Sequence, residues 1–237
     1  MLLADSLVQG FLGSNFMGQA LVVVQLLGSV VMVAAIIGKA KELCFVESAI
    51  RRFKNDFANS GDVLDYYVQR RPARATGIVE IYRQTCERLL VLLSPDAKAL
   101  VAGRGAGEAA LTAREVELVR GTCEHALDAE ELRVEHGMGV ISTVVALEPM
   151  VGLLGTVWGV LDAFAEMGTA GSANLATIAP SISAALVTTV VGLLVAIPGV
   201  LAHTKLNASV QNILAEMEGV VDELMGRVSC EFQGRGA

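Results

Sequence analysis

The longest charge-free stretch of the chain is the feature that most restricts its fold. Asp5 is followed by 33 residues without an Asp, Glu, Lys or Arg, up to Lys39. The most apolar part of this run, residues 17–37, has about the 20 residues that an α-helix needs to cross a hydrocarbon core of about 30 Å. We therefore predict a transmembrane helix at 17–37.

A second gap in charge, from Glu166 to Lys205, predicts another span at 178–201. Composition agrees, because 53% of the residues are hydrophobic and 18% are charged, against about 25% charged in ordinary soluble domains. This apolar excess argues against a soluble enzyme. The net charge of -7 argues against a nucleic-acid partner, because phosphate binding needs a basic face.

A third span, at 137–165, is less evident because Glu148 and Asp162 interrupt its apolar run. We retain it because residues 150–161 are rich in Gly, Val and Leu, and because the span at 178–201 needs a helical partner in the bilayer. The lipid bilayer would then surround three transmembrane helices.

Lys and Arg placement predicts the orientation. Of 18 such residues, 15 lie within 39–133 and the other three follow residue 201. By the positive-inside rule, 38–136 and 202–237 are cytoplasmic, and both the short amphipathic segment 1–16 and the loop 166–177 are outside.

The cytoplasmic segments are expected to be helical, so the fold class is all-α. The first span continues inward to Asn59, and apolar residues at helical spacing continue the third span beyond Lys205. Thr112 and Glu115 form a capping-box signature, and nothing in the sequence stops the helix that they open before residue 165. We therefore expect one helix from 113 through 165.

No catalytic, metal or cofactor site is predicted. The four cysteines have no zinc or redox spacing, and the histidines do not complete one. The glycine-rich run 103–107 lacks the Lys-Ser/Thr ending of a phosphate-binding loop, so we interpret it as a flexible connection.

Small residues recur at helical spacing on the second and third spans, where they let helices approach closely. We assign helix packing to Gly152, Gly155, Gly159, Gly192 and Ala196. Of these, the Gly155/Gly159 face and the stripe from Ala184 to Ala196 are expected to pack between subunits. The nearby threonine hydroxyls allow two interpretations: they bond the preceding turn of their own helix, or they line a polar path.

Four segments carry a resemblance to a known family. They are GLLGTVWG at 152–159, APSI at 179–182, ALVTTVVGL at 185–193 and AIP at 196–198. Together they resemble the ExbB/TolQ/MotA family of inner-membrane proton channels. The three spans make the chain most similar to the TolQ and ExbB branch, since flagellar stator subunits usually have four.

The resemblance implies a homopentamer in the bacterial inner membrane, with a periplasmic N-terminus and a cytoplasmic C-terminus. It would surround helices of a single-span partner similar to TolR or ExbD that carries an intramembrane aspartate, with a TolA- or TonB-like protein as a further partner. Proton flow would move this partner. The proton pathway is expected to involve Thr156, Thr189, Thr188, Ser181 and Ala184.

The chain departs from the family pattern at Ala184, where many relatives carry a glutamate. Glu148 lies about 13 Å further inward by helical rise, so it does not simply replace that group. Glu148 is either a vestibule or intersubunit hydrogen-bonding group or a carboxylate at the membrane interface. Asp162 belongs either to an acidic outer mouth or to a solvated loop.

Two alternatives remain beside the channel. A non-conducting membrane scaffold fits the missing glutamate, and a stator-like subunit would serve another proton-driven motor. Retained Thr156 and Thr189 favour the channel, since a scaffold needs only small residues there. The resemblance leaves open whether the energised system is Tol-Pal, TonB or another, and whether protons or sodium ions pass.

Overall fold

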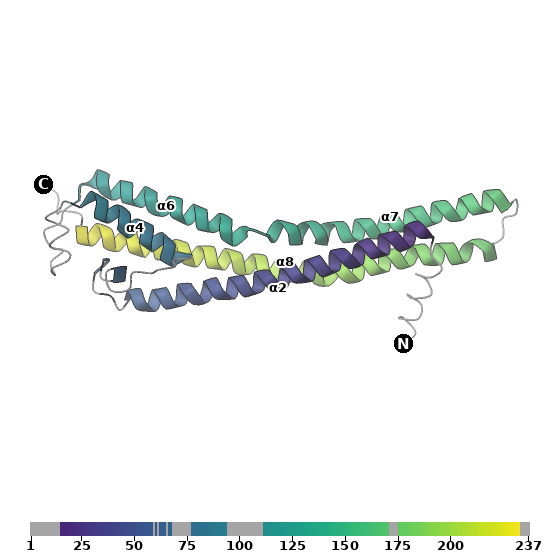
Figure 1. Ribbon diagram of the computed structural model, residues 1–237, viewed down its shortest axis with the longest axis horizontal. Coiled ribbons are helices and arrows are strands. Elements are labelled where there is room, and N and C mark those ends of the chain that lie inside the picture. The colour runs from purple at the N-terminus through teal and green to yellow at the C-terminus, as the bar shows by residue number, and fades with distance from the viewer. Residues whose placement is uncertain are drawn as a thin grey trace. The chain divides into compact units, whose positions relative to one another are not determined.

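The computed structural model describes residues 15–58, 60, 62–64, 66–67, 77–93, 111–170 and 175–232. Their helices are α2 (Phe16–Ala58), α4 (Ile78–Leu92), α6 (Ala113–Glu135), α7 (Met138–Ala170) and α8 (Leu175–Phe232) (Figure 1). No β-strand occurs in these parts of the chain. The all-α prediction is confirmed. Residues 1–14 of the predicted amphipathic segment 1–16 and the glycine-rich run 103–107 lie outside the described residues.

Three helical stretches are long and apolar enough to cross a membrane, as the sequence predicts. They lie in Phe16–Ala58, Ala113–Thr169 and Ile178–Phe232. Prolines occur inside two of the helices, Pro149 in α7 and Pro180 and Pro198 in α8.

The expectation of an uninterrupted helix from 113 through 165 is wrong. α6 ends at Glu135, and α7 begins at Met138. His136 has an extended ψ of 134°, and Gly137 has a φ of 86°, a conformation that a residue with a Cβ rarely adopts. Gly137 is the signal in the sequence that predicts this break.

The chain divides into two compact units, which we describe separately. Unit 1 comprises residues 1–40 and 137–207, and unit 2 comprises 41–136 and 208–237. α2 and α8 each contribute one part to each unit.

In unit 1, the side chains packed between helices are mostly small. Ala163, Ala184, Ala185 and Ala196 are buried, whereas many large apolar side chains point outward: Val23, Leu27, Leu153, Leu161, Leu194 and Ile197. An apolar exterior suits contact with lipid or with other membrane helices.

In unit 2, large apolar side chains are buried between the helices. The predicted capping box opens α6, with the Thr112 hydroxyl accepting from the Glu115 amide and the Glu115 carboxylate accepting from the Thr112 amide. α6 buries an apolar stripe of Val116, Val119, Cys123 and Ala126. The predicted stripe of α8 is buried as well: Leu206, which belongs to unit 1, followed by Val210, Ile213, Met217, Val221 and Leu224.

The four cysteines are all free. Cys86 and Cys123 are buried in unit 2, whereas Cys44 and Cys230 are exposed. Burial raises the pKa of the Cys86 thiol to about 12 and raises the pKa of Cys123. Raised pKa values favour the unreactive thiol form, so both buried cysteines are structural.

Candidate functional site

Three threonine hydroxyls of unit 1 converge on one backbone carbonyl. The Gly152 oxygen accepts from Thr156 Oγ1 at 3.1 Å in its own helix, and from Thr189 Oγ1 at 2.8 Å and Thr188 Oγ1 at 3.2 Å across the α7–α8 contact. The hydroxyls of Thr156 and Thr189 also contact each other. The structure therefore brings together three residues that the sequence assigned to the proton pathway.

Glycines make this convergence possible. A Cβ added to Gly152 would lie 3.0 Å from Thr189 Cα, and one added to Gly155 would lie 2.8 Å from Thr188 Cβ. At Gly159 the added atom would lie 3.2 Å from Ala185 Cα. These residues pack α7 against α8 within one chain, and the expected packing of Gly155 and Gly159 between subunits stays a prediction.

Gln25 of α2 joins the same cluster and was not predicted. Its amide nitrogen donates to the Thr188 oxygen at 3.2 Å and to the Glu148 oxygen at 3.4 Å, and the side chain is only 1% exposed. The Gln25 side chain fits beside α8 because residue 192 is glycine: a Cβ added to Gly192 would lie 2.7 Å from the Gln25 amide nitrogen. An amide side chain within the charge-free run was the available signal.

Glu148 lies inside unit 1. Its side chain is 4% exposed, and Oε2 has no hydrogen-bond partner in the described part of the chain. It faces Gly28 of α2, where an added Cβ would lie 3.5 Å from the carboxyl carbon Cδ. The two roles that the sequence suggested for Glu148, a vestibule or intersubunit hydrogen-bonding group or a carboxylate at the membrane interface, stay predictions.

A second group of predicted residues lies towards the C-terminal end of α7. Asp162 Oδ2 accepts from Asn15 Nδ2 at 2.5 Å, and Ser181 donates to Glu166 Oε2 at 3.3 Å. A pocket in this region is lined by Asn15, Gly155, Trp158, Asp162, Ser181 and Ala184. Ser181, Ala184 and Asp162 therefore share one pocket, which adjoins the threonine cluster at Gly155.

Hydroxyl groups both donate and accept hydrogen bonds, so a chain of them can carry protons between waters or carboxyl groups. Thr188 is 1% exposed and already donates to the Ala185 oxygen at 2.7 Å. Thr156 and Thr189 are only half-buried, which leaves them open to a partner. Within the described residues, no group of three or more His, Cys, Asp or Glu side chains could hold a metal ion.

The sequence profile of the MotA/TolQ/ExbB proton channel family matches residues 94–219. The Tol-Pal system protein TolQ of Haemophilus influenzae is 29% identical over 218 residues, which cover 90% of this chain and 89% of that protein. TolQ of Pseudomonas aeruginosa is 38% identical over 98 residues, 41% of this chain and 42% of the relative. The biopolymer transport protein ExbB of Xanthomonas campestris is 41% identical over 97 residues, 40% and 38% of the two chains.

Proposed function

Because the chain belongs to the MotA/TolQ/ExbB proton channel family, we propose that it is the proton-channel subunit of an energy-transducing motor in the bacterial inner membrane. Its membrane-crossing segments are 17–37, 137–165 and 178–201. Several copies, five by family resemblance, surround a TolR/ExbD-like single-span partner that carries an intramembrane aspartate. A TolA- or TonB-like protein then transmits the force.

The hydroxyl pair of Thr156 and Thr189 carries this proposal. Thr156 bonds the preceding turn of its own helix, which a transmembrane threonine does without any function. Thr189 instead donates across to α7, at 2.8 Å from the Gly152 oxygen. An interhelical hydroxyl pair that stays half-buried is a polar patch on an otherwise apolar surface, and it suits a carboxyl group of a partner helix.

The neighbouring surface supports assembly around such a partner. Leu186, Val190 and Leu193 flank Thr189 at helical spacing on α8, and each is at least 42% exposed. These side chains need cover from lipid or another helix, and the hydroxyls between them are poorly suited to lipid. In the proposed ring this strip of α8 faces the partner.

The available energy is adequate for mechanical work. One elementary charge crossing 100 mV releases about 2.3 kcal/mol, before any pH gradient is counted. Removing a proton from a carboxylic acid in a low-dielectric site leaves a carboxylate that is less stable in those surroundings, and this couples proton transfer to movement of the partner helix.

Proton flux tests the proposal. The chain and its TolR/ExbD-like partner, reconstituted in proteoliposomes, should take up protons, and Thr156→Val and Thr189→Val should reduce the rate at least tenfold. Valine keeps the shape and removes the hydroxyl. Thr143→Val is the matched control, because Thr143 lies exposed on α7 and donates to the Gly139 oxygen of its own helix. Equal fluxes in all four proteins would exclude the threonine path.

The proposed orientation has its own test. In a protein lacking the four native thiols, Thr169→Cys should react with a membrane-impermeant reagent on spheroplasts, whereas Thr122→Cys should react only after the membrane is opened. The reverse pattern would invert the topology and the direction of proton flow.

The scaffold alternative is favoured by Ala184, which supplies no carboxyl group where many relatives carry glutamate. A scaffold would assemble with its partner normally but conduct no protons in any variant. A stator-like subunit would conduct protons yet would not associate with a TolR/ExbD-like partner.

A further inference from the structure

Two buried oxygen atoms in unit 1 lack hydrogen-bond partners among the described residues. They are Oε1 of Gln25 and Oε2 of Glu148. The two side chains are 1% and 4% exposed. The other branch of the Gln25 amide, Nε2, already bonds the backbone oxygen of Glu148 at 3.4 Å, so the unpartnered atoms belong to neighbouring residues of one cluster.

The surroundings of the Glu148 carboxyl group are uncharged. α2 presents Gln25 and Gly28 to this residue, α8 presents Gly192, and Val144 lies one turn earlier on α7. None of these groups titrates, and Glu148 forms no ion pair in the described part of the chain. Lys39, the next cation along α2, follows Gly28 by 11 residues, which is about 16 Å of helix.

An ionised carboxylate is the wrong species for such a site. It accepts hydrogen bonds only, and this site supplies Oε2 with no donor. Burial of an unpaired charge is so costly that the group takes up a proton instead. A protonated carboxyl group has one O–H to donate, and the unpartnered amide oxygen of Gln25 can accept it. One proton would then satisfy both orphan atoms.

We propose that Glu148 is a proton-binding site inside the subunit, held as a carboxylic acid that donates to Gln25 Oε1. The site differs from the hydroxyl pair: eight residues separate Glu148 from Thr156, about 12 Å along α7. Loss of the proton leaves a charge among α2, α7 and α8 that requires water or a cation, so the packing of these helices responds to protonation. The assignment does not depend on proton flux through the channel.

Infrared spectroscopy of the purified chain in lipid nanodiscs tests the assignment without an activity assay. At neutral pH the wild type should show the carbonyl stretch of a protonated carboxyl group, and Glu148→Gln should lose that band. Glu166→Gln is the matched control, since Glu166 is an exposed carboxylate on the same helix, and it should retain the band. Gln25→Met keeps an unbranched side chain, removes the acceptor, and should shift the band to that of a free carboxyl group.

Three outcomes would overturn the proposal in different ways. A neutral-pH spectrum without a band that depends on Glu148 would show an ionised carboxylate. A band converted to carboxylate by sodium chloride at constant pH would make the site a cation site. A band that Gln25→Met leaves unshifted would remove Gln25 as the acceptor. Because Glu148→Gln can itself donate to Gln25, this variant should fold, and its thermal midpoint in detergent checks that it does.

Discussion

The two units of this chain are packed by opposite means. In unit 1 the closest contacts between helices occur where a side chain is missing, at Gly152, Gly155 and Gly192, and many large apolar side chains face outward. In unit 2 the interior is filled by large rings: Phe53, Phe57, Tyr66 and Tyr82 form a cluster with centroid distances of 5.3 to 5.9 Å.

The difference reflects two solvents. Lipid tails are as apolar as leucine, so helices in a bilayer gain little from burying large apolar groups and instead gain from close backbone approach and interhelical hydrogen bonds. In water, burial of apolar area supplies about 25 cal/mol per Å². Replacement of a packed glycine should therefore disturb helix packing most in unit 1, and replacement of a buried phenylalanine should disturb it most in unit 2.

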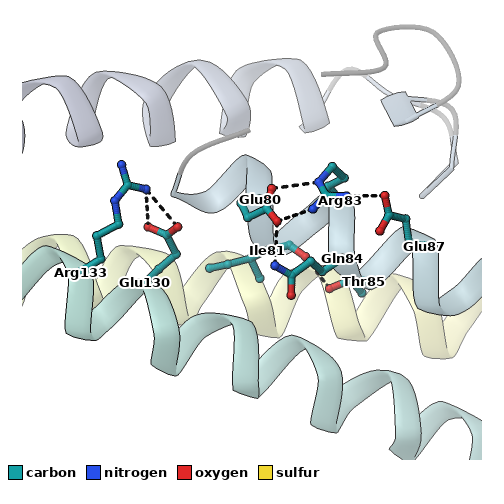
Figure 2. A network of polar contacts seen from close by, with 8 residues as sticks. All are labelled: Glu80, Ile81, Arg83, Gln84, Thr85, Glu87, Glu130 and Arg133. Atoms are coloured by element: carbon teal, nitrogen blue, oxygen red, sulfur yellow. Dashed lines mark hydrogen bonds and ion pairs between the residues drawn. The ribbon is translucent and has the colours of Figure 1, made fainter. Parts of the chain in front are cut away.

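Polar groups follow the same division. Unit 1 buries the Thr188 hydroxyl and the Gln25 amide, whereas unit 2 has ion pairs between neighbouring turns of its helices (Figure 2). Arg83 bonds Glu80 and Glu87 within α4, lowering the pKa of Glu80, and Arg133 bonds Glu130 within α6. Each pair joins residues three or four apart on one helix, and such pairs contribute about 0.3–0.5 kcal/mol.

Shrinking a ring should damage unit 2 most. Phe53→Ala removes a side chain that is 1% exposed and contacts three other rings, so we expect a loss of about 3–5 kcal/mol in the free energy of unfolding. Phe45→Ala is the control on the same helix, because Phe45 is 64% exposed. Chemical unfolding of the whole chain in detergent measures both. Equal losses would mean that the aromatic cluster is not the core of unit 2.

Enlarging a glycine should damage unit 1. Gly155→Ala places a methyl group against Thr188, and overpacking of this kind costs about 1–3 kcal/mol. Gly139 lies on the same helix with nothing within 4 Å of an added Cβ, and alanine is the better helix former by up to about 1 kcal/mol. Thermal midpoints should therefore fall for Gly155→Ala and hold or rise for Gly139→Ala.

The proposed oligomer sharpens this second test. If Gly155 packs only within the chain, Gly155→Ala should lower the thermal midpoint, whereas native mass measurement should show an intact oligomer. Loss of the oligomer without a change in the midpoint would restore the intersubunit role that the sequence suggested.

Local patterns could be predicted from the sequence, and contacts between helices were harder. The three apolar runs, the capping box of Thr112 and Glu115, and the buried stripe that ends at Leu224 all follow from spacing along one helix. Gly137 also carries a local signal, which the continuous helical pattern on both sides concealed.

The interior of unit 1 could not be predicted from α7 and α8 alone, because α2 also packs there. The pairing of α7 with α8 can be inferred from their small residues, but the position of Glu148 depends on which residues α2 presents. Gly28 and Gln25 of α2 provide the space and the polar contact that let Glu148 point inward. The register of α2 against α7 cannot be predicted from the sequence of either helix. For the same reason, the sequence alone gives Gln25 no role, since it is a polar residue within an apolar run.

The smallest expected effect concerns a carboxyl group of unit 2 and depends on pH. Glu231 Oε2 accepts from the Val63 amide at 3.0 Å, yet partial burial raises the pKa of Glu231. The folded chain therefore holds this proton more tightly than the unfolded chain does. Stability is lost as pH rises from the ordinary glutamate pKa, about 4.3, through the raised folded value.

Glu231→Gln removes that pH-dependent loss and keeps an oxygen that can accept from Val63. The variant should therefore have a slightly higher thermal midpoint than the wild type at neutral pH, and the difference should vanish below about pH 4, where Glu231 is protonated in both states. Glu218→Gln, at an exposed position of α8, controls for the change in net charge. A difference that persists unchanged in acid would come from hydrogen bonding to Val63 and not from burial of the charge, and unit 2 would then share with unit 1 a stability set by buried polar contacts.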